Sequence, residues 1–292
     1  MQKALRKYAY ILFIAPAFAW ICVFTVYPFF YSFYISITDM SMLRLGRENI
    51  IGLLNYSELW AETKFWNSIR LSLIFTLFVV AGQFILGFAL ANILKKRSRF
   101  TWLGRTAVML PWVVPPIALG LTWKWILRGG KLGLLNAILT NIRVIPRDWL
   151  SYANALGTVI AVTIWIGIPF TFMLELAGLQ KIPDQLYEAA SIDGAGKLGR
   201  FFYITIPQMK STFLINLIMI TISTIGYFDI IFALTNGGPN DATEVLPLFM
   251  YHAAFKFHQL GRGAAMSVFM LMVSLILTLV YLFIFREKEA LK

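Results

Sequence analysis

The sequence predicts an all-α polytopic membrane protein with six transmembrane helices, built as a single domain over residues 1–292. Two observations favour this class. The chain is 59% hydrophobic and only 14% charged, with a mean hydropathy of +0.72, which is too apolar for an ordinary soluble domain. Apolar runs long enough to cross roughly 30 Å of hydrocarbon also recur along it, at about 8–37, 68–94, 106–127, 155–178, 211–234 and 264–285.

The first span follows a basic stretch at 3–7 and contains a small-residue string at 17–19 that resembles a signal-peptide cleavage site. Because the apolar run continues to Ile37, we expect an uncleaved membrane anchor.

The distribution of Lys and Arg indicates the orientation. The N-terminus has three of them, the loop KKRSRFTWLGR has five, the segment after the fourth span has four and the C-terminal tail has three, together fifteen of the 26. Because cytoplasmic loops carry an excess of basic residues, we expect both termini and the segment 179–210 to be cytoplasmic in a bacterial cell membrane. Orientation also accounts for the net charge of +12, so no nucleic-acid partner is expected.

The loops and bends between spans show three further features. Residues 132–139 have the periodicity of a short amphipathic helix, expected on the outer surface. Gly237-Gly238-Pro239 indicates an outer turn. The third span contains three prolines, which break helical hydrogen bonding and can form a flexing point or a cavity wall: Pro111, Pro115 and Pro116.

Few residues offer redox, metal or catalytic chemistry. Cys22 is the single cysteine and lies in an apolar run, so no disulfide can form within the chain. His252 and His258 lack neighbouring acidic or cysteine ligands, so no metal site is expected. The string GAGK departs from a phosphate-binding loop, because Ser191 replaces its first glycine and Leu198 its hydroxyl residue. We therefore expect no cofactor and no enzymatic activity in this chain.

The cytoplasmic segment 179–210 predicts a helical hairpin. Pro183 suits the first position of a helix, and Gly194 can supply a left-handed stop. A second helix is expected over about 197–204, ending before Pro207. One side of the first helix presents aliphatic and small residues beside the carboxylate of Glu188, namely Leu186, Ala189, Ala190 and Ile192. This side is either a face that docks on a partner or one that packs on the lipid interface.

This hairpin resembles the EAA loop of ATP-binding-cassette importer permeases. The family pattern is E-A-A, three residues, G, nine residues, I, one residue, L-P. The chain has Glu188-Ala189-Ala190, then Gly194, Ile204 and Ile206-Pro207, so only Ile206 departs, as one aliphatic residue for another. The stretches WIGIPFTFMLELAGLQKIPDQLYEAASIDGA and ALTNGGPNDATEVLPLFMYHAAF also resemble the maltose/oligosaccharide-type sugar-uptake branch. The C-terminus lacks a glycine-rich ending, as in the first of its two permease subunits.

The resemblance implies a type I importer permease fold and a set of partners. These are a second homologous permease, two ATPase subunits that hold ATP and Mg, and an extracytoplasmic solute-binding protein facing the 237–239 turn. It further implies that the hairpin sits in a groove of the ATPase, where Glu188 pairs with a basic residue. The coupling residues would be Glu188, Ala189, Ala190, Gly194, Ile204 and Pro207.

Polar and aromatic residues in spans four and five predict where a substrate passes, since polar groups in lipid tend to face a pore or another helix. Thr163, Gly167 and Phe170 share one helical face, as Thr224 and Tyr227 do on the next span. Aromatic rings and hydroxyls suit a neutral sugar, and no Lys or Arg lies near the middle of a span. Ordinary packing through small and hydroxyl residues remains the alternative for each position.

Two carboxylates leave other functions open. Asp229, toward the outside of span five, can accept bonds from substrate or pair with a partner chain. Glu175, near the cytoplasmic end of span four, is expected to reach water and act as a hinge or interface charge. If either exchanged a proton, the chain would be an ion-coupled carrier. A membrane-embedded enzyme is disfavoured, because no nucleophile, base and metal constellation is present.

Overall fold

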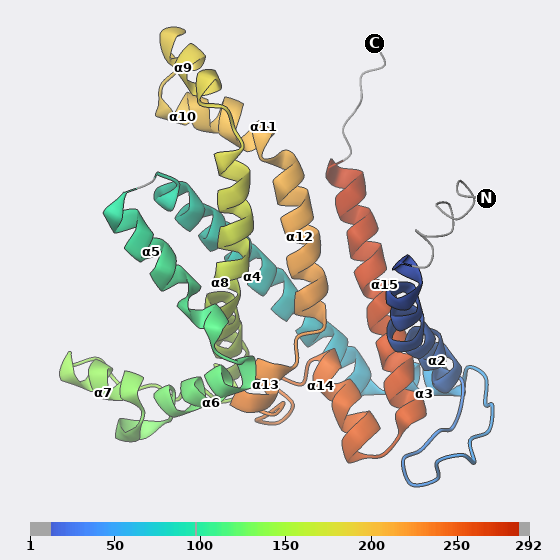
Figure 1. Cartoon of the computed structure of the whole chain (residues 1–292). Helices are drawn as coiled ribbons and strands as arrows, with labels where there is room; N and C mark the ends of the chain where they lie inside the picture. Colours follow the sequence, from blue (N-terminus) through green and yellow to red (C-terminus); the bar gives the residue numbers. More distant parts are fainter. Residues whose placement is uncertain (1–12, 97, 286–292) are drawn as a thin grey trace, which may run out of the picture. The chain divides into compact units, whose positions relative to one another are not determined.

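The computed structural model describes residues 13–96 and 98–285, and these residues are organised almost entirely as helices (Figure 1). They divide into two compact units. Unit 1 comprises the described residues of Met1–Phe65 with Met250–Leu271, and unit 2 those of Trp66–Phe249 with Met272–Lys292. The basic N-terminal stretch, the first residues of span one and the cations of the C-terminal tail lie outside the described residues.

Within the described residues, four helices are long and apolar enough to cross a membrane. They are Phe13–Ser36, α4 (Thr63–Leu94), α8 (Ala155–Gln180) and α15 (Leu260–Phe285). The first of these includes η1 (Cys22–Val26) and α2 (Tyr27–Ser36). Two bent helix pairs pass the same test, so the predicted number of six is reached if each pair is one span.

The third span is one of the bent pairs, and its prolines cause the break. It consists of α5 (Arg99–Met109), η2 (Leu110–Val113) and α6 (Pro116–Ile126), with a bend of 100° between Arg99–Val113 and Pro116–Ile126. Pro115 is the N-cap of α6 and is extended, and Pro116 occupies the first turn, where no N–H is needed. The predicted break in the helix at these prolines is confirmed, and the run 106–127 is not one straight helix.

The fifth span ends earlier than the sequence predicts. α12 (Lys210–Ile225) stops at Gly226, and α13 (Asp229–Leu234) follows as a separate short helix that packs against α6. Glycine is a poor helix former, and Tyr227 N–H turns back to the carbonyl of Thr224 at 3.1 Å. The prediction of a single span over 211–234 is therefore wrong beyond Ile225.

Loop three of unit 2 contains the short helix expected at 132–139. The structure has η3 (Gly130–Leu132) and α7 (Leu134–Asn141). Asn136 of α7 is buried and ties the loop together, because its amide donates to the carbonyl of Arg147 at 2.9 Å and accepts from the indole N–H of Trp149 at 3.0 Å.

Unit 1 is held by a polar junction between the end of the first span and α3 (Leu54–Ala61). The buried side chain of Asn55 donates to the carbonyls of Ser36 and Thr38 at 2.9 and 2.8 Å. Asp39 accepts from the backbone N–H and the amide of Asn49. Two further helices are α14 (Leu246–Tyr251), which ends in this unit, and η5 (His252–Lys256).

Candidate coupling hairpin and translocation cavity

The hairpin predicted at 179–210 is formed by α9 (Asp184–Ile192), α10 (Lys197–Arg200), η4 (Phe201–Thr205) and α11 (Ile206–Gln208). Figure 1 shows it beyond the ends of α8 and α12, which pack against each other. Pro183 is the N-cap of α9 rather than its first residue, and Asp184 lies in the first turn, where a negative charge complements the helix dipole.

The turn of the hairpin is closed by a Schellman motif. Gly194 follows the C-cap with φ of +81°, and its N–H bonds to the carbonyl of Ser191 at 3.2 Å, while the N–H of Ala195 bonds to the carbonyl of Ala190 at 2.8 Å. This positive φ confirms the left-handed stop predicted at Gly194. Arg200 then bridges the two arms by donating to the hydroxyl of Ser191 at 2.6 Å.

The second arm of the hairpin does not end before Pro207, as the sequence predicted, but continues to Gln208. The reason is the π-helical turn η4, in which the N–H of Ile206 bonds to the carbonyl of Phe201. Pro207 falls in the first turn of α11, where its missing N–H costs no helical hydrogen bond.

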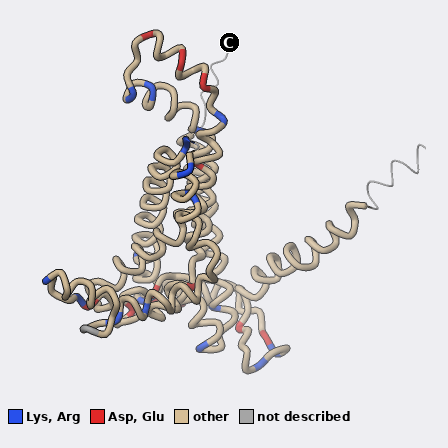
Figure 2. The backbone as a smooth tube through the Cα atoms, turned by 60° about the vertical axis from the view of Figure 1, so that its left-hand side comes forward, with Lys and Arg blue, Asp and Glu red and all other residues tan. Residues whose placement is uncertain are grey.

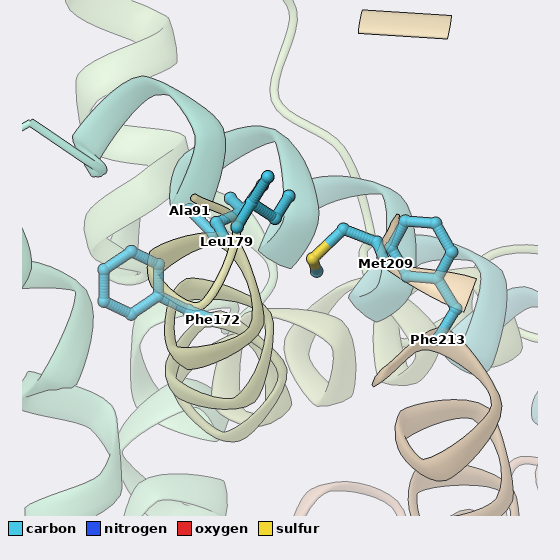
Figure 3. Close-up of a cluster of buried hydrophobic side chains, with 6 residues drawn as sticks. Ala91, Phe172, Leu179, Met209 and Phe213 are labelled. Atoms are coloured by element: carbon cyan, nitrogen blue, oxygen red, sulfur yellow. The ribbon is translucent and has the colours of Figure 1, made fainter. Parts of the chain in front are cut away.

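A buried cluster attaches the hairpin to the membrane helices. Ala91 of α4, Phe172 and Leu179 of α8, and Met209 and Phe213 at the start of α12 converge beneath it (Figure 3). Side chains of the hairpin pack onto this cluster, namely Ile182, Tyr187, Ile204 and Ile206. Tyr187 also shares a hydrogen bond of 2.9 Å with Thr205 across the base. A displacement of the hairpin would therefore be transmitted to α8 and α12 through close packing.

The predicted coupling residues separate into two groups. Glu188, Ala189 and Pro207 are exposed, and Ala190 is half-buried, so the E-A-A string lies on the outside of the hairpin. Ile204 lies on the inside, against the buried cluster, and Gly194 forms the turn. The aliphatic residues Leu186 and Ile192 are also exposed, which leaves an apolar face open beside Glu188.

A cavity of about 530 Å³ lies between α4, the break in the third span, α8 and α12. Of the residues predicted to meet substrate, Gly167, Phe170, Thr224 and Tyr227 line it together. They are joined by Ser223 and by residues that sequence reasoning did not assign to a substrate path, notably Gln83 and Trp112. The three prolines of the third span form part of the wall, as predicted.

The lining of this cavity is aromatic and uncharged. Phe170 and Trp112 meet edge to face with ring centroids 6.4 Å apart, and Tyr227 adds a phenol. None of the described residues that line it is Asp, Glu, Lys or Arg. Aromatic faces bordered by hydroxyl and amide groups are suited to bind a neutral ligand that has both C–H and O–H surfaces.

Gly167 and Gln83 form a close contact on the cavity wall. A Cβ atom at Gly167 would overlap the Gln83 amide, which donates to the carbonyl of Thr163 at 3.3 Å. Thr163 itself is buried and does not line the cavity. Gln83 lines the cavity where Thr163 was expected to, and a large amide near the middle of the second span is the signal that could have identified it.

The two carboxylates lie apart from the cavity lining. Asp229 is exposed in the first turn of α13, not in a continuous fifth span. Glu175 is fully buried, so the expectation that it reaches water is wrong for this chain. The side-chain amide of Asn216, on α12, donates to it at 2.6 Å. The pair links α8 to α12, in keeping with the alternative of a hinge or interface role.

Comparison with known proteins extends over nearly the whole chain. Residues 83–287 match the family described as "Binding-protein-dependent transport system inner membrane component". The chain is 36% identical to the trehalose/maltose transport system permease protein MalF of Thermococcus litoralis, over 95% of this chain and 94% of that protein. It is 33% identical to the sulfoquinovosyl glycerol transport system permease protein SmoG of Agrobacterium fabrum, over 96% and 91%.

Solved structures show the same fold. A chain of a bacterial ABC transporter that imports the acidic polysaccharide alginate aligns with a TM-score of 0.84 at 19% identity, over 99% of this chain and 98% of that one. In its complex with an alginate pentasaccharide-bound periplasmic protein, the TM-score is 0.85, again at 19% identity, over 98% and 96%. These likenesses confirm the predicted all-helical, polytopic membrane fold.

Proposed function

The chain belongs to the family of binding-protein-dependent transport system inner membrane components, and we propose that it imports sugars or oligosaccharides by alternating access. It is a permease subunit of an ABC importer, a multi-pass inner membrane protein and not an enzyme, as the sequence predicted. The likeness to MalF over full length supports its assignment as the first of two different permease subunits.

The cavity of about 530 Å³ carries the proposal for the substrate. Its rings can stack on the C–H faces of a sugar, and the hydroxyls of Ser223, Thr224 and Tyr227 with the amide of Gln83 can bond to sugar hydroxyls. Because the described lining has no charged side chain, a neutral saccharide fits better than an anionic one, which would want a cation or a helix N-terminus. The second permease would supply the rest of the site.

The hairpin supports coupling to two separate ATPase subunits, which would hold ATP and Mg. Its outer face combines Glu188 with small and aliphatic side chains, and this combination fits a groove that offers one basic residue. Its inner face is packed on α8 and α12, two of the helices that line the cavity. In this proposal both termini and the hairpin are cytoplasmic, and the turn at 237–239 meets the binding protein outside.

Reconstitution tests this function. The chain is incorporated into liposomes with its sister permease and two ATPases, and the binding protein is added on the outside. Labelled maltose-type disaccharide should accumulate only when ATP is inside, and a uronic-acid disaccharide should not accumulate.

The alternative is an ion-coupled carrier that uses Asp229 or Glu175. Neither residue lines the cavity, which disfavours this reading. A carrier would transport with this chain alone and stop when an uncoupler collapses the ion gradient. Accumulation that is independent of ATP but sensitive to the uncoupler would replace the importer by the carrier.

A further inference from the structure

A second and larger cavity, of about 700 Å³, lies under the coupling hairpin and belongs wholly to unit 2. It is enclosed by the end of α4, the end of α8 and both arms of the hairpin. It shares no lining residue with the aromatic cavity. The proposed transport path therefore does not account for it.

Among the described residues, four cationic side chains and one carboxylate, that of Asp184, line this cavity. Lys95 and Lys96 follow directly after the last residue of α4, and Lys197 and Arg200 come from α10. Figure 2 shows Lys and Arg residues on the hairpin and at the helix ends below it, together with Asp and Glu residues along the hairpin. Like charges from separated parts of the chain are brought together here, although their mutual repulsion opposes the arrangement.

The environment of Lys95 favours the binding of an anion. Its ammonium group lies over the ring of Tyr187, 5.6 Å from the centroid, and is partly buried. Burial lowers the pKa of Lys95, and the neighbouring charge of Lys96 acts in the same direction. An anion in the cavity would offset both effects. Neither Lys95 nor Lys197 forms an ion pair with another described residue, and Arg200 donates to the neutral hydroxyl of Ser191.

The position of the cavity selects the chemistry of that anion. Because α4 is long and apolar enough to cross a membrane and ends at Leu94, Lys95 and Lys96 follow the end of a membrane helix, where basic residues can meet lipid head groups. Basic pockets next to the ends of membrane helices are suited to acidic phospholipid head groups, and lysine is a general ligand of phosphate. The lining also has neutral hydrogen-bonding groups for phosphate oxygens, including Asn92 and Thr205.

We propose that the cavity beneath the hairpin binds a phosphate-bearing anion, which joins the end of α4 to α10 through Lys95, Lys96, Lys197 and Arg200. An acidic phospholipid is the source nearest to the site, and free phosphate is the other. Bound there, the anion neutralises the cluster and fixes the hairpin relative to the membrane helices. The site does not depend on the identity of the transported substrate.

Photo-crosslinking tests this site on the full-length chain in phosphatidylcholine nanodiscs. The probe is a phosphatidylglycerol analogue with a photoreactive group near its head group, and crosslinked peptides are mapped by mass spectrometry. We expect crosslinks in the peptides that contain Lys95 and Lys197, at a yield that falls about fivefold for each lysine removed as Lys95→Gln or Lys197→Gln. Lys197 is exposed at the start of α10, so Lys197→Gln tests the site even if Lys95→Gln does not fold.

Lys181→Gln is the matched control. It removes an equal charge next to the end of α8 that borders the cavity, but Lys181 does not line the cavity. It should leave the yield unchanged. Suppression of the crosslink by unlabelled phosphatidylglycerol alone assigns the site to lipid. Suppression by inorganic phosphate as well assigns it to phosphate from solution. Equal yields in wild type and Lys197→Gln, or an equal fall in Lys181→Gln, would overturn the proposal.

Discussion

The pair formed by Glu175 and Asn216 allows a quantitative test of how α8 and α12 are joined. Asn216→Leu removes the amide that donates to the buried carboxyl of Glu175 at 2.6 Å and puts an apolar group in its place. A buried polar group left without its partner costs about 1–3 kcal/mol. In a protein of this size that corresponds to a fall in Tm of about 2–4 °C for each kcal/mol.

The double variant separates a lost hydrogen bond from a general loss of packing. Glu175→Met combined with Asn216→Leu removes both polar groups, and replacing both partners by apolar groups of similar shape can be nearly neutral. We therefore expect the double variant to recover most of the lost Tm, with a coupling energy of about 1–3 kcal/mol. Ile215→Leu, on the exposed side of α12, serves as the control.

The assay is thermal unfolding of the purified chain in one detergent at one scan rate, since unfolding of membrane proteins is often irreversible. A Tm for Asn216→Leu that equals the control, or single-variant losses that simply add in the double variant, would refute the reasoning. Either result would mean that the pair does not join the two helices.

Three further predictions follow from the geometry. Gly194→Val places a β-branched residue at φ of +81° in otherwise open space, at a cost of about 1–2 kcal/mol in backbone strain. Asparagine tolerates this conformation, so Gly194→Asn is the control. Binding-protein-stimulated ATP hydrolysis in the full assembly should fall for the valine variant and not for the asparagine variant. Phe170→Ala should raise the KM for sugar uptake about tenfold, through the loss of one stacking ring; an unchanged KM would remove Phe170 from the site. Hydrogen bonds from Asn49, the backbone N–H first, hold the pKa of Asp39 below its ordinary value. Protection of the Asn49 amide from hydrogen exchange, corrected for the intrinsic rate, should therefore be full above about pH 4 and decline as the pH falls through that lowered pKa. The variant Asp39→Asn should show no such step.

The sequence predicted the elements whose causes are local. Apolar length predicted the spans α4, α8 and α15 to within a few residues, and Pro183 with Gly194 located the hairpin. Gly194 was identified because a left-handed helix stop strongly favours glycine over residues with a Cβ. These features depend on a few neighbouring residues, so one sequence is enough to predict them.

The remaining features depend on contacts between distant segments. Hydropathy alone could not show that the run 211–234 breaks at Gly226, because α13 is stabilised by packing on α6 rather than by continuing α12. The π-helical turn that accommodates Pro207 has no recognised sequence signal. Gln83 was missed and Thr163 was chosen because helical spacing within one span does not say which face meets another helix.

The central claim is that the hairpin transmits work from separate ATPases to the membrane helices that line the cavity. The most direct test measures ATP hydrolysis and sugar uptake by the reconstituted assembly with Glu188→Ala, against Asp193→Ala, an equally exposed carboxylate of the same hairpin. The account predicts that both variants assemble and that only Glu188→Ala loses binding-protein-stimulated hydrolysis and uptake. Wild-type rates of both activities in Glu188→Ala would contradict it.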